Sequence, residues 1–214
     1  MSSILKKILN YKDWFKKKEC EVIEYKSPSD KHHCIIELGK TLDEDVKLPK
    51  DFILGNETCL IIDDNFGQVN IISDDILHIF DKHNITNINL LKIHSNMGAF
   101  EVNDLLLQYE NQLKINYVVA DLTIGGSRRV GEENIKLTGV DVVGFLKTFS
   151  DDLKMIIYTG NNLNTYIESN VKIMNKFKAL TGADIYDHII IKRSLTVEER
   201  RKALAYRLFN IKED

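Results

Sequence analysis

The sequence predicts an α/β domain in which a doubly wound parallel sheet of five strands carries helices on both faces. Short apolar runs alternate with longer segments of helical periodicity from residue 57 onward. The runs are continuous (LII, YVVA, MIIY, HIII) and do not alternate with polar residues. Such runs are typical of strands covered on both faces. Polar residues follow the runs directly, at the strand ends where open α/β sheets bind their ligands.

Five strand–helix pairs are predicted in order along this part of the chain. The strands are expected at 58–62, 87–93, 116–120, 154–158 and 188–191, and the helices at 67–82, 100–112, 140–149, 164–180 and 196–209. The last helix has a capping-box pattern, with Thr196 as N-cap and Glu199 three residues later. Three phenylalanines recur at helical spacing and are expected in the core: Phe145, Phe149 and Phe177.

Residues 1–56 have a different pattern and are expected to form a small α+β appendage to a domain spanning 57–214. An amphipathic helix is predicted at 2–18 and short strands at 21–25 and 34–38, followed by a weakly patterned linker at 41–51. A unit of about 50 residues is small for a core of its own. It is therefore expected to pack on the larger domain or on a partner protein, and not on a membrane.

The composition indicates a cytoplasmic protein without a general affinity for nucleic acid. The net charge of −3 offers no basic excess to neutralise phosphates, so no direct nucleic-acid contact is expected. The three cysteines, Cys20, Cys34 and Cys59, suggest no disulfide framework and agree with a reducing compartment. Neither a transmembrane run nor a signal peptide is expected.

Charged and hydroxyl side chains follow four of the five predicted strands. Asp63 and Asp64 end the first strand and Asp121 the third, while Thr159 ends the fourth and Lys192 the fifth. In a doubly wound sheet these ends converge on one pocket. Adjacent carboxylates repel each other, and a hard divalent cation such as Mg²⁺ is the simplest reason to bring them together.

These residue types suit transfer of a phosphoryl group. Asp121 can attack phosphorus and form an aspartyl phosphate. Asp63, Asp64 and Asp121 would hold Mg²⁺, with the backbone carbonyl of Thr123 as a further ligand. Lys192 would supply a positive charge to one phosphoryl oxygen, and the Thr159 hydroxyl would donate a hydrogen bond to another.

The ordered set resembles the receiver domain of two-component response regulators over residues 57–212. The matching positions are the Asp63-Asp64 pair, Asp121 in VVADLTIGG, Thr159 in IIYTGN and Lys192 in HIIIKRS. The resemblance implies a flavodoxin-like fold with strand order 2-1-3-4-5. It also implies Mg²⁺-dependent phosphorylation of Asp121 by a sensor histidine kinase or a histidine phosphotransfer protein. A surface built from the fourth helix, fifth strand and fifth helix would then respond to phosphorylation.

The chain departs from this family near its final strand. Arg193 occupies the place of the proline that usually follows the lysine, and Ile189 occupies the place of the aromatic switch residue. Tyr158 and Tyr186 are the alternatives for the aromatic role.

The loop after the third strand is also unusual, because the glycine expected shortly after the phosphoacceptor comes only at Gly139. This loop carries Arg128 and Arg129, which would form either a lid over the phosphoryl group or part of a solvated loop. Long loops are tolerated at low energetic cost, so the solvated loop is expected.

The expected function is a phosphoacceptor that signals through protein–protein contacts and is not a stand-alone enzyme. One alternative is a pseudo-receiver, an interaction module without phosphotransfer. Another is a metal-dependent phosphohydrolase of the haloacid-dehalogenase type. That family places its nucleophile in an Asp-x-Asp motif after the first strand, whereas this chain reads Asp63-Asp64-Asn65. The output partner and homodimerisation through the final helix are left open.

Overall fold

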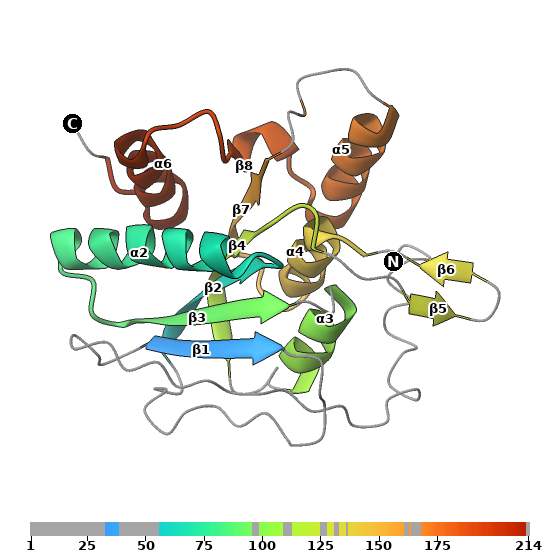
Figure 1. Cartoon of the computed structure of the whole chain (residues 1–214), viewed down its shortest axis with the longest axis horizontal. Helices are drawn as coiled ribbons and strands as arrows, with labels where there is room; N and C mark the ends of the chain where they lie inside the picture. Colours follow the sequence, from blue (N-terminus) through green and yellow to red (C-terminus); the bar gives the residue numbers. More distant parts are fainter. Residues whose placement is uncertain are drawn as a thin grey trace.

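A computed structural model describes residues 33–38, 56–95, 99–108, 113–124, 128–130, 133–135, 137–160, 163 and 168–212 (Figure 1). The helix expected at 2–18, the strand expected at 21–25 and the linker expected at 41–51 lie outside these residues.

The centre of the fold is a six-stranded sheet in which all neighbouring strands are parallel. Its order is β1-β3-β2-β4-β7-β8, with β1 at His33–Leu38, β2 at Glu57–Asp63, β3 at Ile88–Ser95, β4 at Lys114–Ala120, β7 at Lys154–Thr159 and β8 at Ile189–Ile191. The five strands of this sheet from Glu57 onward have the order 2-1-3-4-5, which confirms the predicted fold class. In addition, β1 pairs with β3, so one strand expected in the appendage extends the same sheet.

Helices cover both faces of the sheet (Figure 1). Their bounds are α2 (Phe66–His83), α3 (Ala99–Gln108), α4 (Gly139–Lys147), α5 (Glu168–Thr181) and α6 (Val197–Phe209). Side chains of α2 and α6 pack in one apolar cluster, and those of α3, α4 and α5 pack in another. The two clusters lie on opposite faces because successive side chains of each strand point to opposite sides.

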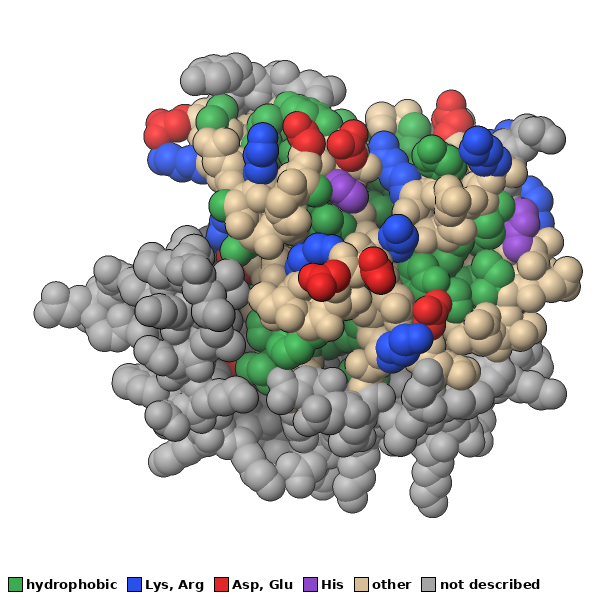
Figure 2. Space-filling model, turned by 180° about the vertical axis from the view of Figure 1, so that it is seen from behind, with side chains coloured by type: hydrophobic (Ala, Val, Ile, Leu, Met, Phe, Trp, Pro, Cys, Tyr) green, Lys and Arg blue, Asp and Glu red, His purple; other side chains and the backbone are tan. Residues whose placement is uncertain are grey.

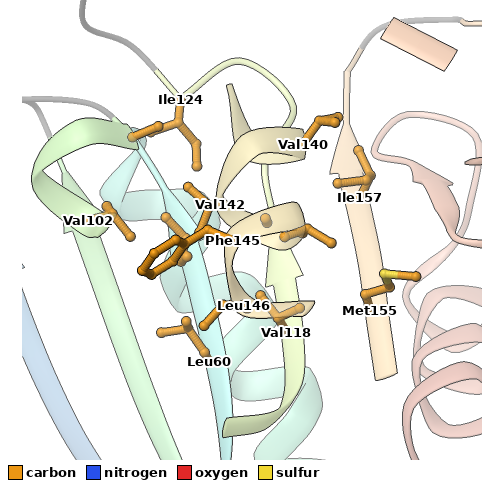
Figure 3. Close-up of a cluster of buried hydrophobic side chains, with 14 of the residues drawn as sticks. Leu60, Val102, Val118, Ile124, Val140, Val142, Phe145, Leu146, Met155 and Ile157 are labelled. Atoms are coloured by element: carbon orange, nitrogen blue, oxygen red, sulfur yellow. The ribbon is translucent and has the colours of Figure 1, made fainter. Parts of the chain in front are cut away.

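The core between α4 and the sheet shows why the strand runs are continuously apolar. Phe145 and Leu146 of α4 lie against Leu60 and Val118 of the central strands (Figure 3). The neighbouring strand residues, such as Cys59, face the α2 and α6 side and are equally buried. Strands buried on both faces therefore account for the sequence pattern.

The C-terminal end of α4 differs from the prediction. The helix ends at Lys147, and Phe149 lies in the turn beyond it with 52% of its surface exposed. Phe145 and Phe177 are buried as expected, but the core assignment of Phe149 is wrong. Thr148 is the C-cap, and its hydroxyl donates to the Phe145 carbonyl, while the Phe149 ring packs edge-on against the Phe145 ring at the exposed end of the helix.

The loop between β4 and α4 contains a small hairpin that the sequence did not predict. Strands β5 (Arg128–Val130) and β6 (Glu133–Ile135) pair in antiparallel fashion. Strands of three residues have no apolar run long enough to be recognised.

A buried carboxylate joins α2 to α6. Asp75 of α2 is 2% exposed. It accepts a hydrogen bond from Nε of Arg200 at 2.5 Å and one from Nε of Arg201 at 2.8 Å. These ion pairs connect helices that are far apart in the sequence, and they fix α6 beside the sheet.

Asp75→Asn is expected to lower the free energy of unfolding by about 2 kcal/mol, because two guanidinium groups lose their shared carboxylate. Urea unfolding measured by circular dichroism checks this. Asp74→Asn is the matched control, since the neighbouring Asp74 side chain is exposed. Equal stability of the two variants would contradict a structural role for the cluster.

The described surface shows no segregation of charge on the face seen in Figure 2, where acidic and basic side chains are interspersed. Among the described helices, none has the length and apolar character needed to cross a bilayer.

Candidate functional site

The predicted site residues meet at the carboxyl ends of β2, β4 and β8. Asp63 is the last residue of β2, and Asp121 directly follows β4. The Asp121 backbone N–H donates to the Ile62 carbonyl at 2.8 Å, which fixes the two strand ends side by side. Lys192 directly follows β8, and its side chain reaches across the end of β7 to Asp121 and on to Asp63 at the end of β2.

Lys192 is held between two buried carboxylates. Its Nζ lies 2.8 Å from Oδ2 of Asp63 and 2.6 Å from Oδ1 of Asp121. The exposed fractions of the three side chains are 16%, 5% and 4% respectively. Among the described side chains, Asp64 brings a third carboxylate near this ammonium group, so these four groups carry an excess of negative charge that another cation would compensate.

Burial, hydrogen bonds and neighbouring charges shift the pKa values of two groups at this site. Burial raises the pKa of Asp63, and the charge of Asp121 raises it further, although hydrogen bonds from Lys192 and the Asn65 N–H act in the opposite direction. Burial lowers the pKa of Lys192, but its hydrogen bonds to Asp121 and Asp63 outweigh burial and the net change is upward. Lys192 is therefore charged at neutral pH.

Both oxygens of Asp121 have partners. Oδ2 accepts hydrogen bonds from the Thr123 N–H and the Thr123 hydroxyl, each at 2.8 Å, while Oδ1 receives Lys192. The next two apolar side chains of the loop, Leu122 and Ile124, are buried and anchor it in the core. Figure 3 shows Ile124 in this cluster. The carboxylate is consequently held in one orientation.

The N-terminus of α4 packs directly against the backbone of Asp121. The Gly139 N–H donates to the Leu122 carbonyl at 3.2 Å. A β-carbon at Gly139 would lie 1.9 Å from the Asp121 carbonyl oxygen, so this position has no room for a side chain. The late glycine of the long loop therefore allows α4 to pack against the strand end that carries Asp121.

A buried ion pair fixes this helix start. Oδ2 of Asp141 accepts from the Thr138 N–H at 2.6 Å and from Nζ of Lys176 at 2.7 Å. Because Lys176 belongs to α5, the contact ties that helix to the turn in which Gly139 meets Asp121.

The donor set fits a small divalent cation. Asp63, Asp64 and Asp121 each offer one carboxylate oxygen, and these oxygens lie within 4.8 Å of one another. Oxygens around octahedral Mg²⁺ are about 3 to 4 Å apart, so the three carboxylates need at most a small movement of their side chains to contact one ion. Asp64 is exposed and Asp63 and Asp121 are buried, which leaves one side of the group open to water. The role of the Thr123 carbonyl stays a prediction.

Two residues beside the carboxylate pair were not assigned a role from the sequence. The Asn65 N–H donates to Oδ1 of Asp63 at 2.8 Å, and the Asn65 side chain caps α2 by accepting from the Gln68 N–H. Nε2 of His94 lies 2.9 Å from the Asp64 carbonyl oxygen. The cap could have been predicted from the sequence, because an asparagine stands just before a helical pattern. The contact of His94 could not be predicted without knowing that β3 lies beside β2 in the sheet.

Thr159 ends β7 beside this group and is completely buried. Its carbonyl accepts from the Lys192 N–H at 2.8 Å, which fixes the backbone that carries the lysine. Farther along the loop after Thr159, the Leu163 carbonyl accepts from the Tyr186 hydroxyl at 3.2 Å. Arg128 and Arg129 belong to β5, and their side chains lie outside the described part of the chain.

Comparison with models of known protein families gave no match, and no curated protein of similar sequence was found. The function is therefore inferred from the residues of the site and from their resemblance to a receiver domain.

Proposed function

We propose that this protein is a phosphoacceptor of the response-regulator type, which accepts a phosphoryl group on Asp121 and signals through protein–protein contacts. The observation that carries the proposal is the placement of Lys192 between Asp63 and Asp121 at the ends of three parallel strands. A buried group of carboxylates with one shared lysine contributes little to stability compared with apolar packing. The presence of these charged residues together is better explained by a site that binds a charged ligand and reacts with it.

Asp121 is the proposed nucleophile. One carboxylate oxygen forms a bond to phosphorus while the bond from phosphorus to the donor's imidazole nitrogen breaks, and the histidine leaves with the bonding electron pair. Oδ1 is the better candidate, because its partner Lys192 has a flexible side chain that can follow the phosphoryl group. Oδ2 is held by the backbone of Thr123 and is less free to react.

The remaining residues position and neutralise the transferred group. Asp63, Asp64 and Asp121 would hold Mg²⁺, with the Thr123 carbonyl as a further ligand, and the bound ion would compensate charge on the phosphoryl oxygens. Lys192 would move from the carboxylates to a phosphoryl oxygen, and the Thr159 hydroxyl would donate to another.

The proposed donor is a phosphohistidine on a sensor kinase or on a histidine phosphotransfer protein in the cytoplasm. The proposed output is a contact with a protein partner, as the resemblance to a receiver domain implies.

Incubation with Mg²⁺ and acetyl phosphate is expected to add one phosphoryl group to the intact protein. Mass spectrometry of the whole chain measures the adduct, which Asp121→Asn should abolish. Asp152→Asn is the matched control, because Asp152 is exposed in the turn before β7 at the opposite end of the sheet. Loss of Mg²⁺ by chelation should prevent the reaction in the unmodified protein.

Other outcomes distinguish the alternatives. Failure to acquire a phosphoryl group, together with failure to bind Mg²⁺ by titration calorimetry, would favour a pseudo-receiver. Rapid multiple turnover of a phosphate ester would favour a phosphohydrolase.

A further inference from the structure

Lys192 has a third neighbour besides the two carboxylates. Its Nζ lies 5.3 Å from the centre of the Tyr158 ring, on the face of the ring. An ammonium group at this distance is attracted by the negative face of an aromatic ring. The lysine is therefore fixed by charge from one side and by an aromatic face from another.

The strand order explains the contact. Lys192 follows β8 and Asp121 follows β4, and β7 lies between these strands in the sheet. The lysine side chain has to cross the end of β7 to reach Asp121, and Tyr158 lies near that end, one residue before Thr159.

The Tyr158 ring is itself held in place by packing. It is 2% exposed and packs in the apolar cluster beneath α2 and α6. Burial raises the pKa of its hydroxyl, while the charges of Arg200 and Lys192 lower it and those of Asp75 and Asp63 raise it. The hydroxyl thus lies in the field of the Asp75–Arg200 pair that joins α6 to α2.

We propose that Tyr158 is a positioning residue for Lys192, whose ring face holds the ammonium group at the strand ends and whose buried surroundings connect it to α6. The effect of the ring on the rate of phosphoryl acceptance rests on the proposed phosphoacceptor function. The contact between Lys192 and the Tyr158 ring does not depend on that function. As Lys192 moves toward a phosphoryl group, the ring gives it a fixed surface to move along and limits the orientations that the lysine samples. The rate of phosphoryl acceptance then depends on the ring, whereas Mg²⁺ binding depends on the carboxylates.

Two substitutions separate the ring from its hydroxyl. Tyr158→Phe keeps the aromatic face, and Tyr158→Met keeps an apolar side chain of similar length without it. With saturating Mg²⁺ and acetyl phosphate, Tyr158→Met is expected to accept the phosphoryl group about fivefold more slowly, as the loss of one cation–π contact implies. Tyr158→Phe should react within about twofold of the unmodified protein, and both variants should keep its Mg²⁺ dissociation constant within about twofold.

A second measurement requires no phosphorylation, and its deciding result comes from the unmodified protein. The ε-methylene protons of Lys192 should show an upfield ring-current shift in the NMR spectrum of the unmodified protein. Tyr158→Phe should retain this shift and Tyr158→Met should lose it. If the Lys192 ε-methylene protons of the unmodified protein had the chemical shift of an ordinary lysine, the proposal would be overturned.

Other results would also overturn it: equal slowing in both variants, which would assign the effect to the hydroxyl, or a parallel loss of Mg²⁺ affinity, which would indicate general damage to the site. Absence of phosphorylation in the unmodified protein would reject the proposed function, while the ring-current shift would still decide the role of Tyr158.

Discussion

Replacement of Lys192 by methionine is expected to destabilise the metal-free protein by about 3 to 5 kcal/mol, because removal of one partner leaves buried carboxylates without compensation. Asp63 and Asp121 would then repel each other across the strand ends. Methionine preserves most of the apolar stem, so the loss reports on the charge. Urea unfolding in the presence of a chelator measures it.

The same substitution should have the opposite effect on cation binding. Without the competing ammonium group, the three carboxylates attract Mg²⁺ more strongly, so the dissociation constant for Mg²⁺ should fall. Added Mg²⁺ should then stabilise the variant more than it stabilises the unmodified protein. Phosphoryl acceptance should nevertheless drop about 100-fold, as is typical when a charge that stabilises the transferred group is removed.

Lys154→Met is the matched control, because Lys154 is exposed at the other end of β7. It should change neither stability nor Mg²⁺ affinity. Weaker Mg²⁺ binding in Lys192→Met would show that the lysine organises the carboxylates and does not compete with the cation, contrary to the electrostatic account.

The sheet could be predicted because β2, β4, β7 and β8 each contain a continuous apolar run that a polar residue follows. The alternation of strands and helices restricts the connections to a few topologies. By contrast, β1 was not placed in the sheet. Residues 34–38 have the same apolar character as the other strands, but an apolar run does not specify which strand it will pair with.

The sequence predicted which residues meet at the site better than it predicted which side chains contact one another. Strand ends brought Asp63, Asp121 and Lys192 together, because parallel strands deliver their last residues to one edge. The direction of each side chain depends on packing across the fold. The contact of Lys192 with Tyr158 therefore required the structure, as did the pairing of Asp75 with Arg200.

Substitution of Gly139 by alanine is expected to disrupt the site from the backbone. The added methyl group would lie 1.9 Å from the Asp121 carbonyl oxygen and 2.9 Å from its carbonyl carbon, distances at which the backbone has to move. Overpacking of this kind costs about 3 kcal/mol. The higher helix propensity of alanine would recover at most about 1 kcal/mol of that. Thermal or urea unfolding should show the net loss.

Gly139→Ala should also lower the rate of phosphoryl acceptance, by more than its effect on the free energy of unfolding would suggest. A shift of the Asp121 backbone would misplace the carboxylate that Thr123 and Lys192 hold, and a displacement near 1 Å lowers reaction rates about 100-fold. Phosphoryl acceptance from acetyl phosphate, measured at a temperature where the variant is folded, checks this.

Gly160→Ala provides the matched control, since a β-carbon there meets no atom of the described residues within 4 Å although the residue directly follows Thr159. It should leave stability and phosphoryl acceptance close to those of the unmodified protein. If Gly139→Ala accepted the phosphoryl group as fast as the unmodified protein, a shift of the Asp121 backbone would have no effect on the reaction. The carboxylate geometry would then be set by Thr123 and Lys192 alone, and the packing of α4 against β4 would have no part in the chemistry.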